Sequence, residues 1–131
     1  QDKLWIMGGG RWNPENVPMN DVWCTEDGVN WTQVTEAAPW DPRIWFSAVV
    51  YRDRLWIMGG WSRVHGNFGD VWYTEDGKEW TEFKSDRIWA NRHELSAVVF
   101  KDNIWVYGGY AEKLSSEVWS LFIPEDFFAG E

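Results

Sequence analysis

The side chains in this sequence that could recognise a ligand gather in the polar segments between short apolar runs. Arginine can hold a carboxylate through two parallel hydrogen bonds, and tryptophan offers a large flat apolar surface. Both residue types are enriched at binding hot spots. The candidate ligand-binding residues are Arg43, Arg63, Arg92, Trp12, Trp61, Trp45, Trp89, His65 and His93. Their combined chemistry would suit an acidic peptide or an acidic carbohydrate.

A structural role competes with this interpretation for the same residues. Tryptophans in connecting segments could cap the ends of neighbouring sheets, where a large aromatic ring buries much apolar surface. Arg43 and Arg92 could pair with carboxylates such as Asp41 or Asp86. The sequence alone leaves both roles open.

The sequence predicts no catalytic residue, no metal site and no cofactor. His65 and His93 lack the spacing that is typical of metal ligands. Cys24 stands between Trp23 and Thr25 and has no basic neighbour in sequence that would favour a reactive thiolate. The adjacent carboxylates in Glu-Asp-Gly at 26–28 and 75–77 belong to turn sequences, where we expect them in solvent.

Composition and charge narrow the classes of partner. The chain has 131 residues, 12 basic and 21 acidic side chains and a formal charge of −9. This balance argues against nucleic acid as a partner, because phosphate binding needs a basic surface. Apolar runs reach only about six residues, so no membrane span is expected. One cysteine excludes an internal disulfide. Secreted and cytoplasmic locations both stay open.

A pattern that recurs about every 49 residues organises the whole sequence. Leu-Trp-Ile-Met-Gly-Gly at 4–9 returns at 55–60, and Ile-Trp-Val-Tyr-Gly-Gly follows at 104–109. Ser-Ala-Val-Val at 47–50 returns at 96–99. We therefore expect a single domain, residues 1–131, with repeat units at approximately 1–46, 47–95 and 96–131.

Each repeat unit is expected to contain four short β-strands. In the middle unit, β-branched and aromatic runs bounded by turn residues place the strands at 47–51, 54–58, 70–74 and 80–83. No segment shows a sustained helical period, so the prediction is an all-β chain. The runs Ala-Val-Val and Leu-Trp-Ile-Met are continuously apolar, which indicates sheets that are covered on both faces.

These features resemble the Kelch family of β-propellers. The family pattern is a glycine pair that ends one strand, a later aromatic residue and a second aromatic after a turn. Gly59-Gly60, Trp72 and Trp80 follow that pattern, and the likeness extends over essentially the whole sequence. It implies blades that are four-stranded antiparallel sheets. The turn sequence Thr-Glu-Asp-Gly at 25–28 also looks like a shortened Asp-box, a structural turn of sialidase-type propellers.

The sequence holds only about two and two-thirds repeats, whereas a closed propeller needs roughly four to eight blades. It begins at the second strand of one repeat and stops shortly after the third strand of another. We therefore expect an incomplete propeller in one chain, completed by a homo-oligomer or by blades of a longer parent. The phenylalanine-rich segment 122–128 is the part expected to cross to a partner chain.

The Kelch resemblance also implies where a ligand would bind. In that family the loops after the glycine pair and the loops between repeats lie on one face. The corresponding segments hold all the candidate residues: 10–20, 35–46, 61–69, 84–95 and 110–116. The leading hypothesis is a non-catalytic binding scaffold. A carbohydrate-active enzyme of the oxidase or sialic-acid epimerase type, with its catalytic residues in other blades, is the alternative. A purely structural repeat segment is the third.

Overall fold

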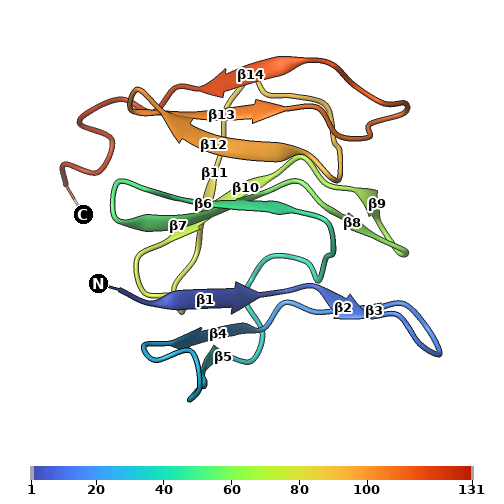
Figure 1. Ribbon diagram of the computed structural model, residues 1–131. Coiled ribbons are helices and arrows are strands. Elements are labelled where there is room, and N and C mark those ends of the chain that lie inside the picture. Colours follow the sequence, from blue (N-terminus) through green and yellow to red (C-terminus); the bar gives the residue numbers. More distant parts are fainter. Residues whose placement is uncertain (1, 131) are drawn as a thin grey trace.

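The computed structural model describes residues 2–130, which form short β-strands joined by turns and loops (Figure 1). The all-β prediction is confirmed for this range. Gln1 and Glu131, which bound the first and third predicted repeat units, lie outside the described residues. Within residues 2–130 there is no helix long and apolar enough to cross a membrane.

Most strands lie where the repeat pattern places them. β6 and β7 coincide with the predicted strands, while β10 and β11 each begin one residue later than predicted. The small hairpins β2–β3 and β8–β9 occupy segments that were expected to be loops. The strand bounds are β1 (Leu4–Met7), β2 (Gly10–Arg11), β3 (Val17–Pro18), β4 (Val22–Thr25), β5 (Thr32–Thr35), β6 (Ser47–Tyr51), β7 (Arg54–Met58), β8 (Trp61–Ser62), β9 (Gly66–Asn67), β10 (Val71–Thr74), β11 (Thr81–Phe83), β12 (Ser96–Phe100), β13 (Asn103–Tyr107) and β14 (Val118–Leu121).

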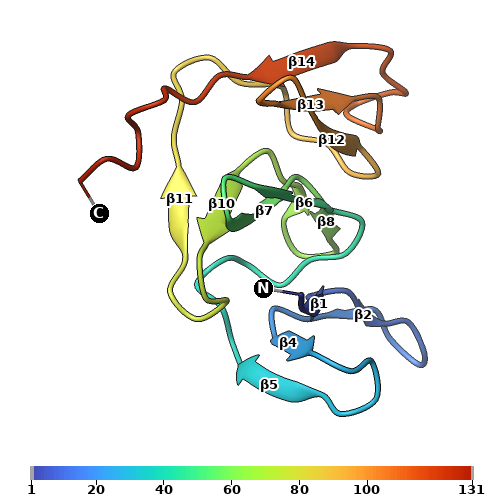
Figure 2. The same cartoon turned by 60° about the vertical axis from the view of Figure 1, so that its left-hand side comes forward.

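The larger sheets follow one another along the chain, and all their strand pairs are antiparallel. The middle sheet has the order β11-β10-β7-β6, the first β1-β4-β5 and the third β12-β13-β14. By repeat position, the first sheet lacks a counterpart of β6 and the third lacks one of β11 among the described residues. Figure 2 shows the sheets stacked in chain order.

Buried apolar side chains fill the spaces between neighbouring sheets. β7 supplies alternate side chains to two clusters, because successive residues of a strand point to opposite faces. Leu55 and Ile57 pack with residues of the first sheet, whereas Trp56 and Met58 pack with residues of the third. Both faces of β7 are therefore covered, which explains its unbroken apolar run, whereas Val50 of β6 in the same sheet is 65% exposed.

The two Glu-Asp-Gly turns are built in the same way. In the first, Asp27 Oδ1 accepts the backbone N–H groups of Val29 and Asn30, and Thr25 Oγ1 accepts that of Gly28. Equivalent bonds form around Thr74 and Asp76 in the second turn. The Asn30 hydrogen bonds hold the pKa of Asp27 well below its ordinary value. These carboxylates thus shape turns at the strand ends.

The C-terminal tail folds back onto its own chain. Phe127 and Phe128 stack edge-on against Tyr73, and the Arg54 guanidinium lies 3.6 Å from the ring centre of Phe128. Phe127 also contacts Phe83 of β11, with ring centres 5.5 Å apart. The tail therefore covers part of the middle sheet. The rings of Phe127 and Phe128 thus have partners within the chain, while Phe122 is 74% exposed, and the crossing of this segment to a partner chain stays a prediction.

Candidate functional site

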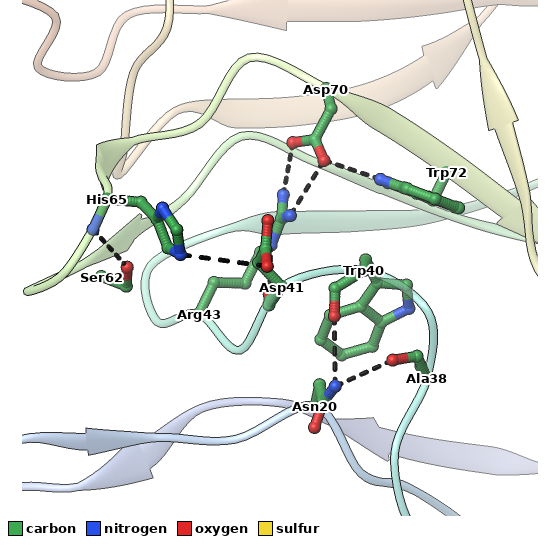
Figure 3. A network of polar contacts seen from close by, with 9 residues as sticks. All are labelled: Asn20, Ala38, Trp40, Asp41, Arg43, Ser62, His65, Asp70 and Trp72. Carbon is green, nitrogen blue, oxygen red and sulfur yellow. Dashed lines mark hydrogen bonds and ion pairs between the residues drawn. The ribbon is translucent and has the colours of Figure 1, made fainter.

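Arg43 joins the first sheet to the middle sheet (Figure 3). Its backbone N–H donates to Met19 O, and its carbonyl accepts the N–H of Gly9, so its main chain belongs to the first repeat unit. Its guanidinium reaches into the next unit, where Nη1 and Nη2 donate to the two carboxylate oxygens of Asp70 at 2.5 and 2.9 Å. Nη1 also donates to Gly59 O. Arg43 is thus a buried link between sheets.

Arg92 makes the equivalent link from the middle sheet to the third. Its N–H donates to Phe68 O, while its Nη1 donates to Gly108 O and its Nη2 to Glu117 Oε2 at 2.6 Å. The Arg92 hydrogen bond and a further one from Trp119 lower the pKa of Glu117. At Asp70, burial alone would raise the pKa, but the hydrogen bond and charge of Arg43 bring it below its ordinary value.

Three of the predicted ligand-binding residues therefore lie in the interior. Arg43 and Arg92 are fully buried, and their guanidinium groups are already paired with Asp70 and Glu117. Trp89 is also buried, packed in the core between the middle and third sheets. Their burial favours the structural role over a contact with a ligand, which stays an untested prediction for these three residues. The carboxylates that pair with the two arginines are not Asp41 or Asp86.

Other candidates come together on the loops as a row of aromatic rings. Trp45 is central, with its ring centre 6.0 Å from Trp12, 5.4 Å from Trp61 and 5.2 Å from His93. His93 continues the row to Tyr110 at 5.4 Å. Neighbouring planes are tilted by 30 to 38°. We call these five residues, contributed by all three repeat units, the aromatic strip.

Much of the aromatic strip faces solvent. The exposed fraction is 66% for Trp12 and 42% for both Trp45 and Tyr110. Trp61 and His93 are partly buried. Contiguous exposed apolar surface is uncommon on soluble proteins, and where it occurs it often marks an interaction site. The strip is therefore the strongest candidate binding surface among the described residues.

The backbone around Trp45 and Trp61 fixes the central part of the aromatic strip. Ile44 and Trp61 exchange backbone hydrogen bonds of 2.9 and 2.8 Å, which place Trp45 beside Trp61. Gly60 makes this approach possible, since a Cβ there would lie 2.9 Å from the Ile44 carbonyl oxygen. Trp45 itself has a φ of 58°, in the left-handed region that a bulky residue rarely adopts.

Asn67 organises the other end of the aromatic strip. Its Nδ2 donates to the backbone carbonyls of Tyr110 and Ala111 at 3.2 and 2.9 Å. Its Oδ1 is then left to accept from His93 Nδ1, which lies 2.5 Å away. His93 Nε2 faces the Glu94 carboxylate at 3.7 Å. Asn67 therefore holds both the His93 ring and the loop that carries Tyr110.

A pocket of about 720 Å³ adjoins this end of the strip. Asn67 lines it, together with Arg92, Lys113 and Glu117 from the surrounding loops. The pocket thus shares Asn67 with the aromatic strip, and its wall combines positive and negative side chains. A ligand that lies along the strip could extend into this pocket.

Arg63 and His65 lie at the tip of the β8–β9 hairpin, outside the aromatic strip. Arg63 is exposed. His65 is also exposed, with Nε2 4.0 Å from the Asp41 carboxylate and its ring 5.8 Å from Phe68. Both stay available to solvent, but they are not packed with the other candidates.

Sequence reasoning missed Tyr110 and Asn67. Tyr110 follows Gly108-Gly109 as Trp61 follows Gly59-Gly60, so the repeat itself carried the signal for an aromatic residue at this position. Asn67 has no comparable signal. Its role depends on contact with His93 and Tyr110, which are remote in sequence.

Residues 2–130 contain no cluster of three or more histidine, cysteine or acidic side chains that could hold a metal ion. The aromatic strip itself offers flat apolar surfaces and a few polar contacts. No protein-family model matches the sequence, and no curated protein matches it either.

Proposed function

We propose that this protein is a non-catalytic carbohydrate-binding module whose sheets are blades of a Kelch-type β-propeller. The observation that carries the binding function is the aromatic strip, a row of neighbouring rings of which Trp12, Trp45 and Tyr110 are the most exposed. Sugar rings have apolar C–H faces that pack against such surfaces, and successive tilted rings suit a chain of sugars better than a single one.

Two repeated features support the propeller architecture. The middle sheet is a four-stranded antiparallel meander, and its neighbours have the same strand order where their strands are described. Arg43 and Arg92 also make equivalent links between successive sheets. Such repetition is what a radial stack of similar units requires.

An acidic carbohydrate is the preferred ligand class. Arg63 remains exposed on the β8–β9 hairpin that begins with Trp61, and Lys113 lines the adjoining pocket. These cations can bind carboxylates of uronic-type sugars while the rings pack against the sugar faces. No observation in the described residues favours the alternative of an enzyme, so binding alone is proposed.

Calorimetric titration with polygalacturonate and cellopentaose tests the proposal. We expect the parent protein to bind polygalacturonate more tightly. Trp45→Gly and Trp61→Ala should each weaken binding by about 30-fold, the effect of losing a hot-spot residue. Phe122→Ala, which removes an exposed aromatic ring outside the strip, is the matched control and should bind like the parent.

Arg63→Ala separates the charge from the stacking contribution. It should weaken polygalacturonate binding and leave cellopentaose binding unchanged. Equal binding by the strip variants and the parent, or no binding of either carbohydrate by the folded parent, would refute the proposal. Competition by poly-glutamate at the same residues would instead identify an acidic peptide as the ligand.

A further inference from the structure

Each repeat unit carries an acidic side chain two residues before a tryptophan, at Asp21, Asp70 and Glu117. In the first two units the indole N–H donates to the carboxylate, from Trp23 to Asp21 and from Trp72 to Asp70, both at 2.7 Å. The three carboxylates therefore occupy equivalent places. Two of them, Asp70 and Glu117, receive an arginine from the preceding repeat unit.

The Asp21 position has no such arginine among residues 2–130. The Asp21 carboxylate accepts from Trp23, and no described lysine or arginine pairs with it. The carbonyl of Gly8, the counterpart of Gly59 O and Gly108 O, likewise receives no guanidinium from this part of the chain. We call Asp21, Trp23 and the Gly8 carbonyl the Asp21 socket.

One edge and one face of the sheet beside the Asp21 socket are also uncovered. β1 pairs only with β4, whereas its counterparts β7 and β13 pair on both sides. Ile6 of β1 is 53% exposed, but its counterparts Ile57 and Val106 are both 0% exposed. A free strand edge, an apolar face and a carboxylate without an arginine partner thus lie together, and each has a partnered equivalent elsewhere in the described residues.

We propose that the Asp21 socket and the free edge of β1 dock another repeat unit of this type, through an arginine followed by an apolar strand. Arg92 and β12 show how such an occupant would bind. In the third sheet Arg92 binds Glu117 while β12 pairs with β13. A second copy of residues 2–130 is a poorer occupant. Its Arg43 and Arg92 are already bound within it.

The complementarity of the site supports this occupant. An arginine supplies the two donors that Asp21 and the Gly8 carbonyl lack, as Arg43 does for Asp70 and Gly59 O. The following strand supplies the backbone groups for the unpaired edge of β1, a common mode of peptide recognition. The inference concerns the opposite part of the chain from Asn67 and does not depend on a carbohydrate ligand.

A fluorescent peptide with the sequence of residues 84–100 is the direct probe, measured by anisotropy with the full chain. We expect saturable binding to the parent protein, weakened at least tenfold by Asp21→Asn. The peptide with Arg92→Gln should bind equally weakly to both proteins, because the two changes remove the same contact. Glu36→Gln, an exposed carboxylate change in the same repeat unit, should bind like the parent.

Circular dichroism of Asp21→Asn checks that the variant folds, and the Arg92→Gln peptide tests the socket without altering the protein. Absence of saturable binding by the folded parent would overturn the proposal, as would unchanged affinity of the Arg92→Gln peptide. Sedimentation equilibrium gives a further test. A parent dimer that Asp21→Asn dissociates would make a second copy the occupant and overturn the choice made above.

Discussion

Trp45 and Glu94 share one backbone conformation at equivalent places in successive repeat units, with φ values of 58° and 54°. The N–H of Glu94 donates to the Trp45 carbonyl at 2.8 Å, so the two left-handed residues are joined directly. The preceding residue takes part in a backbone bridge in both cases, Ile44 with Trp61 and His93 with Tyr110. The repeat thus gives both positions the same backbone conformation. Only Trp45 carries an aromatic side chain, so only Trp45 belongs to the aromatic strip.

Substitution by glycine should affect these two positions differently. A left-handed non-glycine residue costs about 1–3 kcal/mol, part of which glycine returns as chain entropy. Glu94→Gly loses only an exposed contact with His93, so we expect a gain of about 1 kcal/mol in the free energy of unfolding. Trp45→Gly loses three ring contacts, so we expect no increase in its free energy of unfolding. Urea denaturation measures both, and a loss of stability in Glu94→Gly would contradict the prediction.

The buried link at Arg43 should contribute more to stability than the link at Arg92. The Asp70 side chain is 24% exposed and the Glu117 side chain 57% exposed, so Glu117 can regain water when its arginine is removed. We expect Arg43→Met to cost about 3 kcal/mol and Arg92→Met about 1–2 kcal/mol in chemical denaturation. Arg43→Lys should not restore stability, because an ammonium group cannot reproduce the bidentate geometry. Equal costs at both sites would refute this ranking.

The lowered pKa of the Asp70 carboxylate leads us to expect that the protein loses stability in acid. Its pKa is below the ordinary value near 4 in the folded protein, so the unfolded chain binds more protons as the pH falls through that range. The stabilisation is present above pH 4 and is lost as the pH falls through the lower folded pKa. Chemical denaturation gives the free energy of unfolding at pH 6 and at pH 3. The decrease between the two pH values should be smaller for Asp70→Asn than for the parent. Glu36→Gln serves as the control, and it should keep the parent's difference.

The tail prediction concerns Phe128. Its ring contacts Trp56 and Tyr73 and lies under the Arg54 guanidinium, so Phe128→Ala should destabilise the chain by about 2 kcal/mol. Phe122→Ala, in the same segment but 74% exposed, should change stability by less than about 0.5 kcal/mol. Thermal unfolding compares the two. A dimer that Phe128→Ala converts to a monomer would instead support exchange of the tail between chains.

Periodicity and turn residues sufficed to place the main strands, since both are local properties of the sequence. The Arg-Asp turn after β6 illustrates this. Arg52 and Asp53 have φ values of 48° and 57°, which suit a two-residue hairpin. The β2–β3 and β8–β9 hairpins were not predicted, because two-residue strands leave no measurable alternation.

The candidate site was only partly predictable from composition. Trp12, Trp45, Trp61 and His93 were identified because aromatic residues outside the repeated core positions are conspicuous. The burial of Arg43 and Arg92 could not be predicted, because a buried arginine and an exposed one look alike in sequence. Their partners, Asp70 and Glu117, lie in the next repeat unit, more than twenty residues away. Such pairing is a property of the stacked sheets.

Arg43 and Arg92 stand beside Trp45 and His93 of the aromatic strip, whereas the loop tips at 12–16 and 63–65 carry neither arginine link, and this arrangement bears on how the protein can diversify. Arg43 binds Asp70 and the Gly59 carbonyl across the sheets, whereas the tip at 63–65 meets the preceding repeat unit through the exposed contact of His65 Nε2 with Asp41, at 4.0 Å. Substitutions or insertions at these tips would reshape the ligand surface and leave the stacking unchanged. One scaffold could in this way carry many specificities, as variable loops on a rigid framework do.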